Sequence, residues 1–178
     1  MKFHYWVLNY MEHRKQYDTK IILRRREERE IPKGKAGVVF CKDCGAVYYK
    51  KSWHHNLRDY KNFSKDLPVS FVLCPACEMI KNNQFEGRII IENIPAKNSE
   101  DLRHLIEGFC HRAYLRDPLD RLIKIKKPKV GVLEIITTEN QLAAKLAKKI
   151  KEVFKKITEK ISYSASPSDV VYIQMKFK

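Results

Sequence analysis

The spacing of hydrophobic residues divides the chain into three stretches. In the first, residues 1–36, aromatic and aliphatic residues recur at helical spacing, but Phe3, Tyr5 and Val7 also alternate as in a strand. The pattern therefore leaves the element over residues 1–23 open between helix and strand. The mixed charges of RRREERE at residues 24–30 lead into IPKGKAG, where proline and glycine favour a linker at residues 31–36.

Short runs typical of β-strands fill the second stretch, residues 37–94. They are VVF, AVYY, VSFVL and RIIIENI, and a Cys-x-x-Cys pair directly follows the first and the third of them. The segment 52–68, between the second and third runs, is polar and typical of turns. We expect a small β unit over residues 37–94.

Two helical patterns alternate with strand patterns in the third stretch, residues 95–178. The first helix is predicted from Ser99, a residue favoured as an N-cap, to about Tyr114, and the second from about Glu139 to Lys160. Their apolar stripes comprise Leu102, Leu105, Ile106, Phe109 and Ala113, and Leu142, Leu146, Ile150, Val153 and Ile157. Strands are predicted at residues 121–127, 130–138, 161–164 and 169–177. The order α-β-β-α-β-β predicts an α+β domain whose antiparallel sheet has helices packed on one face.

The composition permits a packed core and indicates no membrane span. With 178 residues, 44% of them hydrophobic, the chain is long enough for one ordinary domain or two small ones. No run approaches the roughly 20 apolar residues of a membrane-spanning helix, and MKFHYWVLNYMEHRK is charged where a signal peptide would be apolar. Four of the five cysteines form Cys-x-x-Cys pairs, which suits a reducing compartment. We expect a cytoplasmic protein that does not associate with membranes.

The formal net charge of +15 is concentrated at the two ends of the chain. Residues 1–36 hold ten Lys and Arg against five acids, residues 37–93 eight against six, and residues 94–178 eighteen against ten. A field of this sign favours a polyanionic partner and makes binding dependent on salt. A solvated surface rich in Lys and Glu is the alternative interpretation of the charge.

The two Cys-x-x-Cys pairs, Cys41 with Cys44 and Cys74 with Cys77, carry the strongest chemical signal. Each pair can form a tight knuckle, and two knuckles supply the four thiolates of a tetrahedral zinc site. Gly45 and Pro75 are turn residues that suit such knuckles. A closed four-sulfur site has no position for water or substrate, so the expected Zn²⁺ is structural.

Other interpretations of the cysteines follow from the same residues. An iron–sulfur cluster remains open because it uses the same four ligands, whereas a thioredoxin-like site needs a βαβ context that the pattern lacks. His54 is a weaker alternative ligand. Cys110, on the apolar stripe of the first helix, is predicted to be a small buried residue.

Basic and aromatic residues in three places are predicted to contact nucleic acid. One group follows the first cysteine pair, a second lies on the helix over 139–160, and a third lies in the N-terminal arm, residues 1–36. The groups are Lys50, Lys51, Trp53 and His55; Lys145, Lys148, Lys149 and Lys151; and Arg24, Arg25, Arg26 and Arg29. The alternatives are that Trp53 covers a small metal core, that the lysines form a solvated helix face, and that the arginines pair with neighbouring glutamates.

Three segments of the sequence resemble a family of short prokaryotic zinc-ribbon proteins. The resemblance rests on CKDCGAVYYKKSWHH, on CPACEMIKNNQFEGRIII and on LEIITTENQLAAKLAKKIKEVF, and it runs from about residue 37 to the C-terminus. More distantly, these segments resemble the N-terminal half of the Nmd-three family, adaptors that bind the large ribosomal subunit in archaea and eukaryotes. The resemblance implies zinc ligation by the four paired cysteines, contact with ribosomes and an archaeal origin. Members of that family carry further cysteine pairs and β domains, which this sequence lacks.

Together these features predict a ribosome-associated protein that binds ribosomal RNA and acts by occupying a site on a ribosomal subunit. Assembly, anti-association, hibernation and a lineage-specific ribosomal role all fit this prediction. The alternatives are a zinc-ribbon transcription or DNA-binding module and a protein-interaction adaptor. The sequence contains no phosphate-binding loop, dinucleotide fingerprint, HExxH motif or nucleophile elbow, so we do not expect an enzyme. It does not indicate the oligomeric state.

Overall fold

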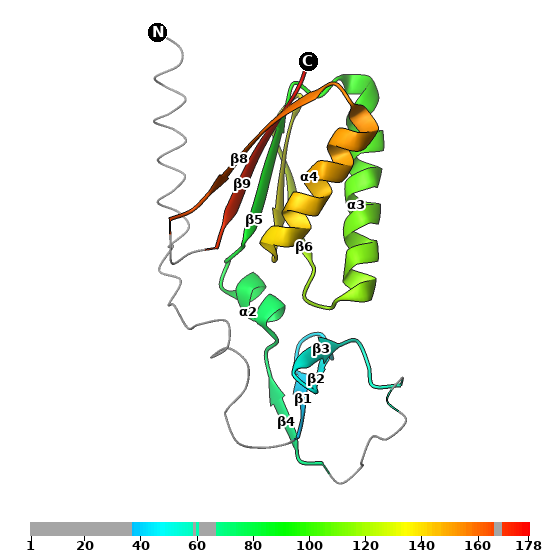
Figure 1. Ribbon diagram of the computed structural model, residues 1–178, viewed down its shortest axis with the longest axis vertical. Coiled ribbons are helices and arrows are strands. Elements are labelled where there is room, and N and C mark those ends of the chain that lie inside the picture. The colour runs from blue at the N-terminus through cyan, green and yellow to red at the C-terminus, as the bar shows by residue number, and fades with distance from the viewer. Residues whose placement is uncertain (1–36, 59, 61–66, 166–168) are drawn as a thin grey trace.

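The computed structural model describes residues 37–58, 60, 67–165 and 169–178. These residues form a smaller unit, residues 37–81, and a larger unit, residues 87–178 (Figure 1). The chain is an α+β protein, which confirms the predicted class. The N-terminal arm, including Arg24, Arg25, Arg26 and Arg29, lies outside the described residues.

The smaller unit is a four-stranded sheet followed by a short helix. Its strands, in the spatial order β3-β2-β1-β4, are β1 (Val38–Cys41), β2 (Val47–Tyr49), β3 (Ser52–His54) and β4 (Val69–Val72). The pairs β1–β2 and β2–β3 are antiparallel, whereas β1 and β4 are parallel. Strand β3 lies within the segment 52–68, which was predicted to be turn-like. A tight turn before it brings the chain back, so that β3 pairs with β2. Helix α2 (Pro75–Lys81) then leads toward the larger unit.

The larger unit contains a five-stranded sheet with the strand order β6-β7-β5-β9-β8. Its strands are β5 (Gly87–Glu92), β6 (Leu122–Lys129), β7 (Val132–Thr137), β8 (Ile157–Tyr163) and β9 (Val171–Phe177). The prediction of an antiparallel sheet is wrong, because β5 runs parallel to β9 while the other three pairs are antiparallel. Strand β5, which we assigned to the unit over 37–94, is the central strand of this larger sheet.

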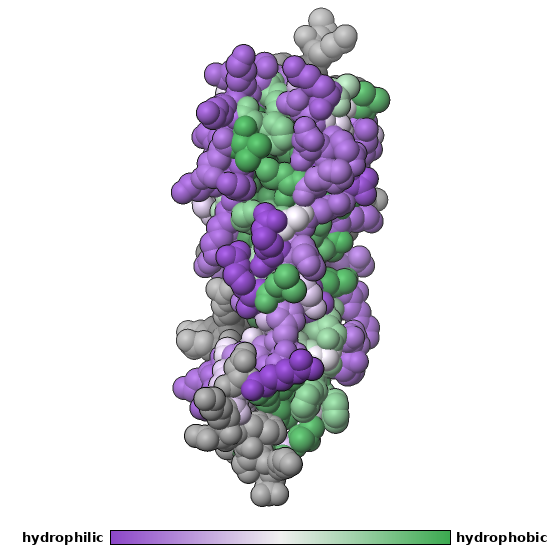
Figure 2. Space-filling view, turned by 90° about the vertical axis from the view of Figure 1, so that its right-hand side faces the viewer, coloured by the Kyte–Doolittle hydropathy of each residue, from purple (hydrophilic) through white to green (hydrophobic). Residues whose placement is uncertain are grey.

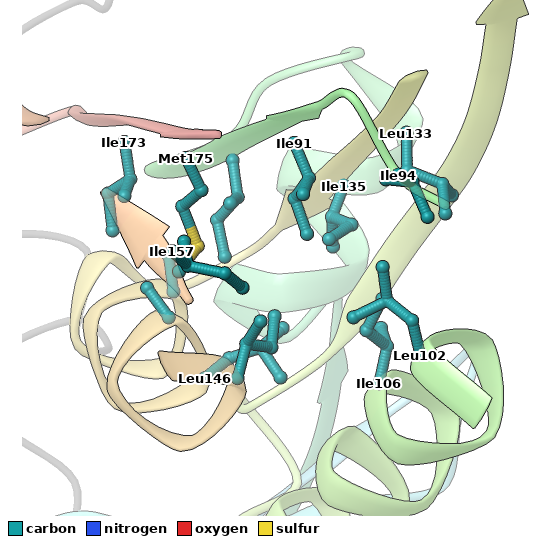
Figure 3. Packing of buried hydrophobic residues seen from close by; sticks show 14 of the residues in the cluster. Ile91, Ile94, Leu102, Ile106, Leu133, Ile135, Leu146, Ile157, Ile173 and Met175 are labelled. Carbon is teal, nitrogen blue, oxygen red and sulfur yellow. The ribbon is translucent and has the colours of Figure 1, made fainter. Parts of the chain in front are cut away.

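Two helices cover one face of the larger sheet, α3 (Ser99–Arg116) and α4 (Asn140–Phe154) (Figure 1). A short 3₁₀ helix, η2 (Ala96–Asn98), precedes α3. Leu102 and Ile106 of α3 and Leu146 of α4 point toward the isoleucines of the sheet, and all three are fully buried (Figure 3). Full burial of such a side chain contributes about 1.5 to 3 kcal/mol, so this layer is the main source of stability. Within the described ranges, no helix covers the other face.

The ends of both helices differ from the prediction. The residue before α3 is Asn98, so Ser99 is the first helical residue and not the N-cap. Helix α4 ends at Phe154, because the next residue, Lys155, has a positive φ of 41° that does not continue a right-handed helix. Ile157, predicted on the helical stripe, instead begins β8 and enters the same core. In the described parts of the chain, no helix is both long enough and apolar enough to cross a membrane.

Candidate metal centre

The first cysteine pair lies in a tight knuckle at the end of β1. Cys41 ends the strand, its N–H donates to the carbonyl of Ala46 at 2.7 Å, and the Gly45 N–H donates back to the Cys41 carbonyl at 2.9 Å. Gly45 has φ of +74°, a left-handed conformation that glycine adopts without steric cost. This turn folds Cys44 back beside Cys41, as the sequence predicted.

The second pair is arranged differently from the predicted knuckle, because it begins helix α2. Cys74 is the N-cap, Pro75 follows in the first turn, and the backbone N–H of Cys77 donates to Cys74 Sγ at 3.4 Å. Proline suits the first helical position because the N–H it lacks would have no partner there. A thiol at the cap position also accepts a backbone donor that would otherwise have no acceptor within the helix.

The folding of β1 beside β4 brings the two pairs together. All four sulfur atoms lie within 4.8 Å of one another, and Cys44 Sγ is 3.7 Å from Cys74 Sγ. Sulfurs bound at about 2.3 Å to a tetrahedral ion would lie about 3.8 Å apart, so the arrangement fits one ion. Three of the cysteines are buried and Cys44 is half-buried. The four cysteines could therefore bind a metal ion.

Backbone donors and burial set the pKa values of these thiols. Burial raises the pKa of Cys41, but the backbone N–H groups of Cys44, Cys74 and Asp43 outweigh it and lower the pKa to about 6. Burial raises the pKa of Cys77 to about 11 and also raises that of Cys74. A bound cation would favour the thiolate form of all four, so metal binding would release protons.

Apolar side chains enclose the cysteine cluster. Trp53, Leu73 and Leu119 pack against it, and the Trp53 ring lies 5.5 Å from that of Tyr48. Trp53, which we predicted to contact nucleic acid, thus packs as a cover over the cysteine cluster. Leu119 comes from the larger unit, so both units contribute to this small core.

The two histidines after β3 make contacts within the chain. His54 Nε2 lies 2.8 Å from Ser52 Oγ and 3.1 Å from the Tyr60 hydroxyl, and His54 is outside the cluster of four cysteines. His55 Nε2 lies 2.5 Å from the carbonyl of Tyr114, to which it donates. His55, also predicted to contact nucleic acid, therefore links the smaller unit to α3.

The predicted basic face of α4 is exposed, but part of its charge is paired. Lys149 lies 3.3 Å from Glu152, and Lys151 lies 3.1 Å from Glu159. Lys148 has no ion-pair partner among the residues that the structure describes, and Lys145 lies on the same exposed surface. Figure 2 shows that hydrophilic side chains predominate on the side of the molecule that it displays.

Sequence reasoning missed Arg121, a basic residue in contact with the cysteines. Its Nη1 donates to Cys77 Sγ at 3.5 Å. Burial lowers the pKa of Arg121, but the sulfurs, with Cys44 foremost, outweigh this effect and raise it. In the sequence Arg121 looks like part of the basic strand RLIKIKK, and no local pattern distinguishes it from its neighbours.

The fold and the cluster define an α+β protein with a four-cysteine centre that could hold a metal ion. No protein-family model, curated protein or solved structure matches the chain significantly.

Proposed function

We propose that the protein binds ribosomal RNA and acts by occupying a site on a ribosomal subunit, with a structural Zn²⁺ in its cysteine centre. Four cysteine ligands would complete a tetrahedral shell, so the ion would hold the smaller unit together without binding substrate. The close spacing of the sulfurs favours a single ion over an iron–sulfur cluster, whose own iron and sulfide atoms would separate the ligands further.

The observation that carries this proposal is the turn between β2 and β3. Tyr49 pairs with Ser52, so Lys50 and Lys51 alone form the turn, with φ values of 49° and 65°. Two left-handed residues define a type I′ turn, for which Asn-Gly is strongly preferred. A left-handed lysine costs about 1 to 2 kcal/mol. Residues with strain of this kind cluster at functional sites.

The surroundings of this turn suit a nucleic-acid ligand. Both lysines are exposed, and Lys50 Nζ lies 5.6 Å from the ring centre of Tyr49 and 5.5 Å from that of Tyr60. Cations beside aromatic rings are the groups that contact phosphates and stack on unpaired bases. The metal centre would keep this hairpin rigid because the knuckle of Cys41 and Cys44 is adjacent in the same sheet.

The net charge of +15 and the exposed lysines of α4 support a polyanionic partner of considerable size. The resemblance to the Nmd-three family favours ribosomal RNA within this class. Roles in assembly, anti-association or hibernation, and a role as a lineage-specific ribosomal protein, are all consistent with occupancy of a ribosomal site.

Binding assays with purified, metal-loaded protein test the proposal. Ribosomal subunits, protein-free ribosomal RNA and duplex DNA are compared at low and high salt, and we expect ribosomal RNA to bind best, with affinity falling as salt rises. Preference for duplex DNA would instead indicate a DNA-binding module. Partners that survive nuclease and high salt in a pull-down would indicate a protein-interaction adaptor, and either result would overturn the proposal.

A further inference from the structure

Arg121 connects the larger unit to the cysteine cluster. It immediately precedes β6, and its Nη1 reaches Cys77 Sγ across the boundary between the units. Its Nη2 is buried and has no hydrogen-bond partner among the described residues. A buried donor without an acceptor is costly, so a strongly negative sulfur cluster beside this guanidinium would offset the cost.

Several contacts hold the Arg121 side chain in place. Its Nε donates to the carbonyl of Pro118 at 2.8 Å, and its guanidinium carbon lies 5.3 Å from the ring centre of Tyr114. Its backbone N–H donates to Thr138 Oγ1 at 2.9 Å. The guanidinium is therefore fixed by the larger unit before any ion binds.

The same segment of the larger unit makes further contacts with the smaller unit. The His55 ring meets the Tyr114 ring edge-on at 4.7 Å, in addition to its hydrogen bond to the Tyr114 carbonyl. Leu119 packs against the cysteines, and its own carbonyl accepts from Thr138 Oγ1 at 2.6 Å. Residues 114–121, which run from the last turn of α3 to the residue before β6, thus form a docking segment.

The negative charge of a metal-loaded cysteine cluster would strengthen its contact with Arg121. Four thiolates around one divalent cation carry a net charge of about −2, because four negative charges meet two positive ones. The guanidinium is permanently charged and can donate to two sulfurs at once. The attraction between opposite charges at this distance is stronger in a partly buried site than in water.

We propose that Arg121 is an outer-shell partner of the bound metal ion, and that metal binding thereby locks the docking segment, residues 114–121, onto the smaller unit. Arg121 is a positioning residue, since it acts on the ion through Cys77 and Cys44. The inference does not depend on RNA binding.

Metal affinity tests the first half of this proposal. The variants Arg121→Gln and Arg121→Lys are compared with Arg112→Gln, which removes an exposed arginine from α3. In competition with a chromophoric chelator for Zn²⁺, we expect Arg121→Gln to bind about 10- to 100-fold more weakly, the usual effect of losing an outer-shell partner. Arg121→Lys should recover part of the loss, and Arg112→Gln should match the wild type.

Cobalt spectroscopy separates this role from a general loss of structure. The Co²⁺ form of Arg121→Gln should keep the charge-transfer and visible bands of a four-thiolate tetrahedral site, because all ligands remain. Zn²⁺ affinity of Arg121→Gln within twofold of the wild type would overturn the role of Arg121. Loss of the four-thiolate spectrum would also overturn it, since Arg121 would then be needed for the ligands themselves to assemble.

Hydrogen exchange of the wild-type protein tests the second half without any variant. We expect removal of the metal to speed amide exchange at least fivefold in the docking segment, residues 114–121, and to leave the central strand β5 unchanged. Equal exchange of the docking segment with and without metal would overturn the proposed lock.

Discussion

At the scale of single residues, the cysteines combine a chemical role with a structural one. Cys74 caps helix α2 and Cys41 accepts a hydrogen bond from the Cys74 N–H at 3.2 Å, so these candidate ligands also fix the backbone. The spacing of the four cysteines was sufficient to predict this cluster. Arg121 could not be predicted, because its contact with Cys77 depends on a chain path that no local pattern encodes.

Replacement of one ligand tests the structural role of the centre. We expect Cys77→Ser to lose the metal and to unfold the smaller unit, because a sheet of this size has little core without the ion. The larger unit should remain folded, since its core is separate. Metal content and amide exchange of each unit are the measurements.

The matched control for that experiment is Cys110→Ala, which also removes one cysteine but leaves the cluster intact. It should retain a full complement of metal and lose about 1 kcal/mol or less of stability from a small cavity. Retention of stoichiometric metal by Cys77→Ser, or its loss from Cys110→Ala, would contradict the assignment of ligands.

The thiol of Cys110 should be unreactive in the folded protein. It is 2% exposed, and burial raises its pKa to about 12, so at pH 8 only about one thiol in ten thousand would be ionised. Reaction with a thiol reagent at pH 8 should proceed in two steps, with four thiols released by a chelator and the fifth by denaturant. Modification of five thiols on chelation alone would show that the larger unit needs the metal to fold.

At the scale of elements, the close contact of β5 with α4 requires a glycine. A Cβ on Gly87 would lie 2.5 Å from the Ala143 Cβ and closer still to Thr137 Oγ1. We therefore expect Gly87→Ala to destabilise the protein by about 1 to 3 kcal/mol, measured by denaturant unfolding. Gly108→Ala, in the middle of α3 where only the flexible Arg112 is near, should instead stabilise it by about 0.5 to 1 kcal/mol. Equal effects would contradict the packing described here.

The strained turn allows stability and binding to be separated. The double substitution Lys50→Asn, Lys51→Gly supplies the residues that a type I′ turn prefers, so we expect stability to rise by about 1 to 2 kcal/mol. If the lysines contact RNA, affinity for RNA should fall about tenfold. The slope of log affinity against log salt concentration should also become shallower, by the contribution of roughly two phosphate contacts. A more stable variant with unchanged RNA affinity would mean that the turn is only a solvated tip.

The hydrophobic pattern predicted most elements but not their partners. The hydrophobic pattern located α3, β6, β7 and β9 to within a few residues. One face is buried in α3 and β9, whereas every residue of β7 is buried. Helix α2 was missed, since a helix that begins within a cysteine pair is too short to show a stripe. The parallel pairing of β5 with β9 was missed as well. The alternation of buried and half-buried residues along β5 records which of its faces is buried, but not which strand lies beside it.

At the scale of the whole molecule, the two units are connected by side-chain contacts as well as by the covalent chain. Strand β5 follows α2 directly and becomes the centre of the larger sheet, while the docking segment, residues 114–121, returns to cover the cysteines. The boundary predicted at residue 94 lies where the spacing of hydrophobic residues changes from that of strands to that of helices. It separates β5 from the strands with which it pairs.

The measurement that tests the central claim most directly is sedimentation of native cell extract through a sucrose gradient at low and high salt, with this protein followed by mass spectrometry. We expect it to migrate with a ribosomal subunit or a larger ribosomal particle at low salt and to move to the light fractions at high salt. Its presence in the light fractions at both salt concentrations would contradict a ribosomal role.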